Sequence, residues 1–159
     1  MDKTPQSPVW QQPQIVLHSQ RLLKSYRRWT GRDLLAQQAS ELETSRALFE
    51  APFVVVSDGM QSDPILNYGN AAALKLWVMD WKTLTSIPSR QTAEPVHQSE
   101  RARLMAEVQQ NGFIDNYKGV RIASNGQRFF IESAVVWIVI DESGTQIGKA
   151  ATFSKWTPV

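Results

Sequence analysis

The stretch Arg128–Ile140, which reads RFFIESAVVWIVI, constrains the fold more than any other part of the chain. Successive side chains of a β-strand point to opposite faces, so a strand here divides these residues into two sets. One face presents Phe129, Ile131, Ser133, Val135, Trp137 and Val139, and the other presents Phe130, Glu132, Ala134, Val136, Ile138 and Ile140. A half-solvated antiparallel strand would alternate apolar with polar residues, whereas this one is apolar on both faces. Other elements of the protein, a second subunit, or both must therefore cover the two faces.

The N-terminal third supplies candidates for one of these covers. Residues 1–14 are rich in proline and glutamine and predict a flexible lead-in, whereas residues 15–51 predict a helical extension of two helices. The first helix should end at Gly31 as its C-cap, and the second should run from Asp33, its expected N-cap, to about Glu50. The first helix carries an apolar stripe at helical spacing, made of Ile15, Leu22, Tyr26 and Trp29. This stripe predicts a face that is buried against a sheet or a partner.

Residues 52–157 predict a single mixed domain. The expected elements are strands over 53–56 and 65–68, short helices over 71–79 and after Asp80, a loop over 89–98, a helix over 99–110 with Ser99 as its N-cap, and strands over 113–123, 128–140 and 146–156. Asn70 is expected to cap the first short helix. The Asn125-Gly126 pair between two apolar runs is a strong hairpin signal. This order predicts an α+β fold with a five-stranded antiparallel sheet and short helices on one face.

Composition excludes several classes of protein. The 17 basic and 15 acidic residues give a net charge of +2, an excess too small to predict a nucleic-acid partner. The chain has no cysteine, which rules out disulfides, thiolate metal sites and cysteine nucleophiles. No apolar run reaches the roughly 18 residues of a membrane span, and the first residues lack the basic start and apolar stretch of a secretory signal. We therefore expect a cytoplasmic protein without a transmembrane helix.

Several segments of the sequence are similar to known families. Ile65–Trp77, reading ILNYGNAAALKLW, resembles the second strand and following helix of PAS domains, and Asn111–Trp156 resembles their C-terminal sheet. More closely, HSQRLLKSYRRWTGRDL, ALFEAPFVVVSDG, DPILNYGN, SRQTAEP, ERARL and GFIDNYKGVRIASNGQRFFIE resemble segments of the MEKHLA domain. That PAS-related family occurs alone in bacteria and at the C-terminus of plant homeodomain–leucine-zipper transcription factors. The resemblance implies a PAS-like sensory or interaction module without a known reaction of its own.

The resemblance also implies where a small ligand would lie, because PAS domains hold cofactors between the sheet and the short helices. The residues expected at this site are Trp77, Trp81, His97, Tyr117, Arg121 and Trp137. Aromatic side chains with a polar edge suit a planar ligand, although filling the core is their commoner use. Arg121 is expected either to pair with Glu132 across a hairpin or to orient a ligand.

The cofactor is unknown from the sequence, but some cofactors are excluded. Without cysteine, the adduct photocycle of light-oxygen-voltage flavin domains is impossible. Haem is disfavoured, because PAS haem ligands lie on the long helix whereas His97 precedes the helix predicted here. The absence of a short-spaced pair of ligating residues predicts no metal site.

An enzyme is the alternative hypothesis. Helices followed by a curved sheet also fit small cyclases and isomerases with a cone-shaped fold, and His97 with Asp115 or Glu132 would then supply acid–base chemistry. No nucleophile elbow, phosphate loop or dinucleotide fingerprint is present. We leave enzyme activity open and favour a module without catalysis.

The partners expected from the sequence are proteins as well as a small molecule. The chain has no recognisable output domain, so a sensory module of this kind would signal through a protein partner. The apolar stripe of the first helix and the apolar outer face of the sheet predict a homodimer, with Ile15, Leu22, Tyr26 and Trp29 at its interface. A monomer in which the helices cover their own sheet is the competing arrangement.

Overall fold

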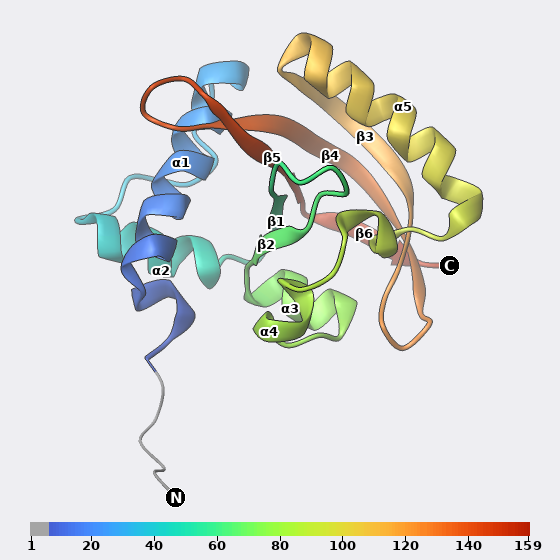
Figure 1. Ribbon diagram of the computed structural model, residues 1–159. Coiled ribbons are helices and arrows are strands. Elements are labelled where there is room, and N and C mark those ends of the chain that lie inside the picture. The colour runs from blue at the N-terminus through green and yellow to red at the C-terminus, as the bar shows by residue number, and fades with distance from the viewer. Residues whose placement is uncertain (1–6) are drawn as a thin grey trace, which may run out of the picture.

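An antiparallel sheet forms the centre of the molecule, with helices on both of its faces (Figure 1). The computed structural model describes residues 7–159, apart from the side chains of residues 95–98. The strands are β1 (Val54–Asp58), β2 (Leu66–Gly69), β3 (Phe113–Ile122), β4 (Arg128–Ile140), β5 (Gln146–Phe153) and β6 (Lys155–Pro158). They follow the order β2-β1-β5-β4-β3, and β6 also pairs with β4. The predicted α+β fold and its five-stranded antiparallel sheet are confirmed, with β6 as a short addition.

The strand β6 arises because the last predicted strand is interrupted. We expected one strand over residues 146–156, but β5 ends at Phe153 and β6 begins after Ser154. β5 pairs with Val135–Ile140 of β4, whereas β6 pairs with Phe129–Glu132 of the same strand. The two strands therefore line one edge of β4 in succession.

The helices begin and end mostly where capping residues predict. They are η1 (Val9–Gln11), α1 (Pro13–Thr30), α2 (Glu41–Phe49), α3 (Ala71–Trp77), α4 (Trp81–Leu84), η2 (Ser89–Thr92) and α5 (Pro95–Asn111), where η marks a 3-10 helix. The side chain of Asn70 accepts a hydrogen bond from the amide of Ala73, and that of Asp80 accepts one from Thr83, as expected of N-caps. Gly31 follows α1 at φ 73°, the left-handed conformation expected of the C-cap.

Two predicted helix starts are wrong. The second helix begins at Glu41 rather than Asp33, because Ser40 caps it by accepting from the amide of Glu43. Asp33 instead pairs with Arg27 at the end of α1, with an Nη1–Oδ1 distance of 2.7 Å. The long helix α5 begins at Pro95 rather than after Ser99, because proline is well suited to the first turn of a helix.

A bulge in β4 changes the two faces that simple alternation predicts. Ser133 has φ 54°, and the pairing of β4 with β3 shifts between Ile131 and Ala134. Beyond this extra residue the alternation is reversed, so Phe129 and Ile131 share a face with Ala134 instead of with Val135. Glu132 is exposed, so the strand is buried on both faces only from Ala134 to Val139. The expected division of the strand is therefore wrong: the residues before Ser133 lie on the faces opposite to those predicted relative to the residues after it, and the face that carries Glu132 is not apolar there.

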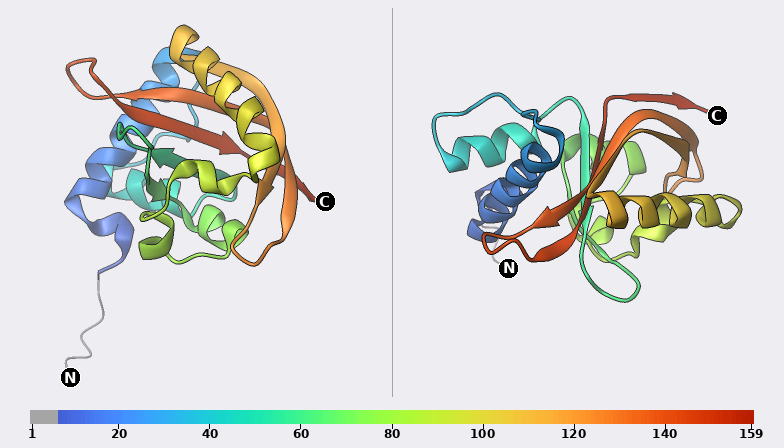
Figure 2. Two further views of the ribbon diagram at one scale, coloured as in Figure 1. Left: turned by 45° about the vertical axis from the view of Figure 1, so that its right-hand side comes forward. Right: turned by 90° about the horizontal axis from the view of Figure 1, so that it is seen from above.

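The N-terminal helices cover one face of the sheet in the same chain. Figure 2 shows α1 and α2 on one side of the strands and α5 on the other. We call this side the outer core; its buried members include Ile15, Leu22, Tyr26, Leu48, Val55, Tyr68, Val135, Trp137 and Val139. Hydrogen bonds fix α1 to β4, because the indole Nε1 of Trp137 donates to Leu22 O and that of Trp29 donates to Ile138 O. The outer-core face of β4 is therefore covered by α1 of the same chain.

The opposite face of the sheet packs against α3 and α5. We call this side the inner core; its buried members include Trp77, Val108, Tyr117, Phe129, Ile131, Ala134, Val136 and Phe153. The Trp77 ring meets Phe129 and Phe153 edge-to-face, with centroids 5.4 Å and 6.0 Å apart. This core differs from the outer one because its centre is hollow.

Candidate functional site

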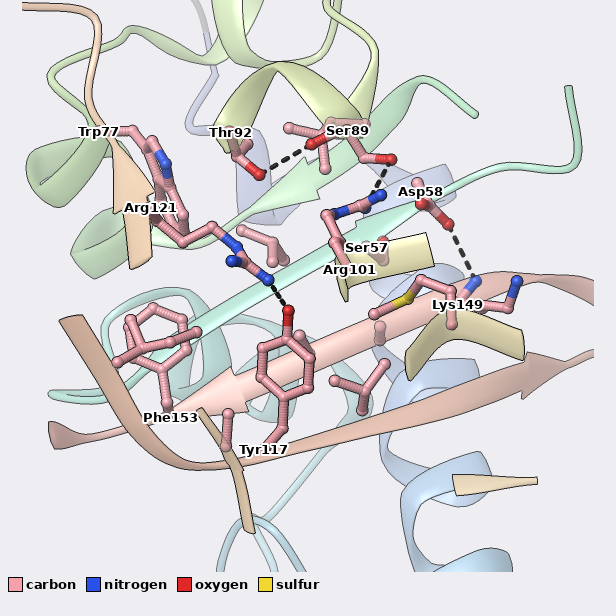
Figure 3. A pocket seen from close by; sticks show the side chains of 18 residues that line it. Ser57, Asp58, Trp77, Ser89, Thr92, Arg101, Tyr117, Arg121, Lys149 and Phe153 are labelled. Atoms are coloured by element: carbon pink, nitrogen blue, oxygen red, sulfur yellow. Dashed lines mark hydrogen bonds between the residues drawn. The ribbon is translucent and has the colours of Figure 1, made fainter. Parts of the chain in front are cut away.

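A cavity of about 70 Å³ lies in the inner core, between the sheet and the helices α3, η2 and α5. Figure 3 shows that its wall combines aromatic and apolar side chains with several charged ones. The polar and charged residues of the wall are Ser57, Asp58, Ser89, Thr92, Arg101, Tyr117, Arg121 and Lys149. This is space for only a few water molecules, since water takes about 30 Å³ in the liquid. Apolar surface combined with a few converging polar and charged groups is typical of small-molecule sites in proteins.

Strand β3 brings two of the charged and polar groups to the cavity. Tyr117 and Arg121 are four residues apart and therefore share a face of the strand, where both are buried. Asn116, at φ 56°, forms a bulge that changes the direction of the strand just before Tyr117. A Cβ atom at Gly119 would lie 3.1 Å from Arg121 Nη1, so the glycine leaves room for the guanidinium over the strand.

The guanidinium of Arg121 is held by neutral acceptors. Its Nη1 donates to Val120 O at 2.8 Å, and its Nη2 donates to the hydroxyl of Tyr117, over whose ring it also lies (Figure 3). Burial and, to a lesser extent, the positive charge of Arg101 lower the pKa of Arg121 to about 10, against the attraction of Glu100. Arg121 therefore still carries its charge at neutral pH.

A second charged group lies at the other end of the cavity, where β1 meets β5. The carboxylate of Asp58 accepts a hydrogen bond from the backbone amide of Lys149 at 3.2 Å. Gly148 allows this approach, because a Cβ atom there would lie 1.9 Å from Asp58 O. Burial raises the pKa of Asp58, opposed by hydrogen bonds from Ser89 and the Lys149 amide and by the charges of Arg101 and Lys149.

Arg101 reaches this end of the cavity from α5. Its Nη2 donates to the hydroxyl of Ser89 at 3.1 Å, and Thr92 donates to Ser89 O at 2.8 Å. Burial lowers the pKa of Arg101, whereas Asp58 and Asp63 raise it. The carboxylates near this end therefore act on Arg101, and the Asp58 charge also lies close to Lys149.

The structure brings together half of the predicted site. Trp77, Tyr117 and Arg121 line the cavity, as the sequence predicts for a ligand site between sheet and helices. Trp81 and Trp137 belong to the outer core instead, where Trp81 packs against Tyr68 and Trp137 against Tyr26. The bulge at Ser133 explains the position of Trp137, because it places that residue on the face opposite Ile131. The side chain of His97 lies outside the described residues.

The predicted pair of Arg121 with Glu132 is not formed. Arg121 lies opposite Phe129 in the β3–β4 ladder, and Glu132 is exposed on the other side of β4. The acid–base alternative also loses its carboxylates, because Asp115 is exposed and pairs with Arg32 at 3.2 Å. Neither Asp115 nor Glu132 lines the cavity.

Sequence reasoning missed the residues at the Asp58 end of the cavity. Asp58 follows the expected strand over 53–56, Ser89 falls in the expected loop over 89–98 and Arg101 in the expected helix over 99–110, and the sequence analysis named none of them as a site residue. The β1–β5 pairing brings Asp58 to Lys149, about 90 positions away in the chain, and the packing of α5 over the sheet brings Arg101 to the same end of the cavity. A charged residue two positions after the apolar run Phe53–Val56 was the available signal.

The described part of the chain has neither a membrane-spanning helix nor a cluster of metal-binding side chains. Within residues 7–159, no helix is both long and apolar enough to cross a lipid bilayer. Among the side chains that the structure describes, no group of three histidine, aspartate or glutamate residues is placed to hold a metal ion.

The residues predicted for a dimer interface are occupied within the chain. Ile15, Leu22 and Tyr26 are buried in the outer core, and Trp29 packs there while its indole binds β4. A homodimer stays a prediction, but this stripe already has a partner in the protein's own sheet.

Comparison with known proteins gives one family and one fold. The family model of the MEKHLA domain matches residues 16–158. The homeobox-leucine zipper protein HOX32 of Oryza sativa subsp. indica is 24% identical over 135 residues, which are 84% of this chain and 16% of that protein. The chain therefore spans about a sixth of the length of this curated relative.

Solved structures share the fold at low sequence identity. The PAS domain of a protein from Colwellia psychrerythraea superposes with a TM-score of 0.62 at 12% identity, over 74% of this chain and 94% of that one. The light-state dimer of the fungal blue-light photoreceptor Vivid gives a TM-score of 0.57 at 14% identity, over 82% of this chain and 88% of that one. These likenesses establish a PAS-like fold.

Proposed function

The chain belongs to the MEKHLA domain family, and from this premise we propose that it is a PAS-type sensory module that binds a small ligand in the inner core and signals to a protein partner. The observation that carries the proposal is the cavity with Arg101 and Arg121 on its wall. A core that served stability alone would be filled with apolar groups, since buried charge is costly. Polar residues in a hollow core are consistent with a site that is completed by a ligand.

The size of the cavity supports a ligand smaller than a flavin or a haem. Pockets for ligands of drug size enclose roughly 300–1,000 Å³, several times the 70 Å³ found here. The absence of cysteine further excludes a cysteine–flavin adduct. The ligand that we propose is therefore a small molecule, and its binding would need no chemistry by the protein.

The route from the cavity to the surface runs through β1. Asp58 lines the cavity, and the neighbouring hydroxyl of Ser57 contacts His18 Nε2 of α1 at 2.8 Å and Asn67 Oδ1 of β2 at 2.5 Å. A second connection joins β4 to α1, where the amide of Ile140 donates to the hydroxyl of Ser25 at 2.9 Å. A ligand that moves β1 or β4 would thus also move α1, and we propose α1 as the element that a partner senses.

The partner would be a protein, and a second copy of the chain is one candidate. The relative HOX32 is a longer protein, and the Vivid structure is a dimer. Sedimentation analysis should give a homodimer of about twice 18.0 kDa. A monomer at high micromolar concentration would contradict the dimer without affecting the ligand proposal.

Native mass spectrometry of the full chain, purified without denaturation, tests the ligand proposal. We expect an additional mass on the wild type that Ala134→Leu removes, because Ala134 is fully buried on the cavity wall and the larger side chain fills the space. Val139→Ile is the matched control, since it enlarges a side chain on the opposite face of the same strand. The proposal fails if no additional mass is found on the wild type and if no metabolite in a screen raises its melting temperature more than that of Ala134→Leu. Val139→Ile should behave like the wild type in both measurements.

A further inference from the structure

The charges on the cavity wall do not balance. Arg101, Arg121 and Lys149 are cationic, and Asp58 is the acidic residue among the described lining residues. Asp58 and Asp63 both attract Arg101, and Asp58 also attracts Lys149. Asp63 also pairs with Arg90 at 3.0 Å. Asp58 and Asp63 thus lie near Arg90, Arg101 and Lys149, whereas neither of them acts on Arg121 at the other end of the cavity.

Arg121 is the uncompensated charge. Its side chain is buried, with 6% of the residue exposed. Among the described residues no carboxylate oxygen lies within 4 Å of it, and the exposed Glu100 attracts it only from a longer distance. Removing a guanidinium from water costs several kcal/mol that a paired anion normally offsets. The structure contains such a cation on a cavity wall without such an anion.

Arg121 also has hydrogen-bonding capacity to spare. A guanidinium has five N–H donors in a planar fork, and the described residues accept from Nη1 and Nη2 once each. Planar oxyanions accept two parallel bonds from this fork. Trp77, on the same cavity wall, adds a buried indole Nε1–H that has no acceptor among the described residues. Both residues therefore present donors that lack acceptors.

The rest of the wall restricts the body of the ligand. Met105, Ile131, Val136 and Phe153 surround the same space with apolar surface. The oxygens of an inorganic oxyanion would lie against these apolar side chains without stabilising them. A short carbon chain would bury apolar surface on both sides of the contact. The volume of about 70 Å³ limits such a chain to a few carbon atoms.

We propose, on the basis of the sensory function above, that the inner cavity binds a small organic monocarboxylate. Its carboxylate would neutralise Arg121 and accept from the guanidinium fork, and its short carbon chain would lie against Met105 and Ile131. Binding is a reversible ion pairing and involves no change in covalent bonds. The ligand class follows from the unpaired cation and the apolar wall together.

Titration calorimetry on the full chain tests this assignment with sodium formate, acetate, propionate and butyrate at constant ionic strength. Propionamide is the neutral control of matched shape, and sodium phosphate is the inorganic control. We expect at least one carboxylate to bind at least tenfold more tightly than propionamide and phosphate. Trp77→Phe, which removes the indole donor but keeps an aromatic ring, should weaken binding about threefold or more.

Arg121→Met should weaken carboxylate binding at least tenfold, because it keeps an unbranched side chain but removes the charge. Arg128→Met is the matched control: Arg128 lies on the same hairpin but is exposed and pairs with Glu94. Circular dichroism of each variant checks that it is folded.

Binding of propionamide as tight as propionate, or carboxylate binding unchanged in Arg121→Met, would overturn the assignment. The absence of binding by all four carboxylates would overturn it as well. A neutral ligand found by native mass spectrometry would overturn it while leaving the sensory function intact. Failure of the sensory function is recognised separately, by the absence of any bound mass and of any difference between wild type and Ala134→Leu.

Discussion

The two cores on either side of the sheet are built from similar apolar and aromatic residues but treat their polar groups differently. In the outer core, the indoles of Trp29 and Trp137 and the hydroxyl of Ser25 all bond to backbone groups across the helix–sheet boundary. In the inner core, the indole of Trp77 has no hydrogen-bond partner and Arg121 has no carboxylate within 4 Å among the residues that the structure describes. The hydroxyl of Tyr68 is the exception in the outer core: it is buried near Ser19 but has no partner within hydrogen-bonding geometry among the described residues. The polar groups of the outer core therefore join α1 to the sheet, whereas donors of the inner core have no acceptors among the described residues.

The largest expected effect comes from the outer core. Trp137→Ala removes a fully buried ring that packs edge-to-face on Tyr26 at 5.0 Å and bonds Leu22 O. We expect the free energy of unfolding to fall by about 3–5 kcal/mol, as for other large aromatic truncations. Urea denaturation measures this loss. If Trp137→Ala costs less than about 1 kcal/mol, α1 does not pack on the sheet as described.

The next effect tests whether the contact between His18 of α1 and Ser57 of β1 depends on pH. Burial and, to a lesser extent, the positive charge of Arg21 lower the pKa of His18 to about 4. Because the unfolded state has a pKa near 6.5, it binds the proton more readily, so the contribution of neutral His18 is lost as the pH falls from about 6.5 to 4. We expect wild type to lose up to about 3 kcal/mol more than His18→Gln over this range.

Unfolding of both proteins at a series of pH values measures the difference. His18→Gln is a suitable comparison because its amide can still contact Ser57 without titrating. If the free energies of unfolding of the two proteins change with pH in the same way, His18 is not shielded from water beside Ser57 and Tyr68.

A smaller effect concerns the bulge that separates the two faces along β4. Ser133 is exposed at φ 54°, where a β-branched residue is strained. Ser133→Val should lower the free energy of unfolding by about 1–2 kcal/mol, whereas Ser133→Gly should leave it unchanged or raise it slightly. Thermal denaturation of the two variants distinguishes them. Equal stability of both would mean that β4 runs without this bulge.

The sequence predicts the order of the elements well because local signals specify them. Asn70, Asp80 and Gly31 are capping residues with a direct effect on their own helices, and the Asn125-Gly126 pair lies between β3 and β4 as the hairpin signal predicts. The N-terminal boundaries of α2 and α5 were less predictable, because Ser40 competes with Asp33 as a cap and Pro95 with Ser99.

The site was only half predictable because two of its determinants are not local. Simple alternation along β4 places Trp137 on the same face as Ile131. The bulge at Ser133 reverses this alternation, and no residue type in that stretch predicts the bulge. The meeting of Asp58 with Arg101 depends on how α5 packs over the sheet. Arg121, by contrast, was visible as a charge within an apolar strand, and its position in the cavity agrees with that signal.

The central claim is that Arg121 is buried without a compensating anion until a ligand supplies one. The most direct test compares the free energy of unfolding of wild type and Arg121→Met, with and without saturating sodium propionate. We predict that without propionate Arg121→Met is as stable as wild type or more stable, since replacing an unpaired buried charge by an apolar group of similar length removes a desolvation cost. With propionate, only the wild type should gain stability, following RT ln(1 + [L]/Kd). If Arg121→Met is instead about 3–5 kcal/mol less stable without propionate, Arg121 is already compensated within the fold and the claim is wrong.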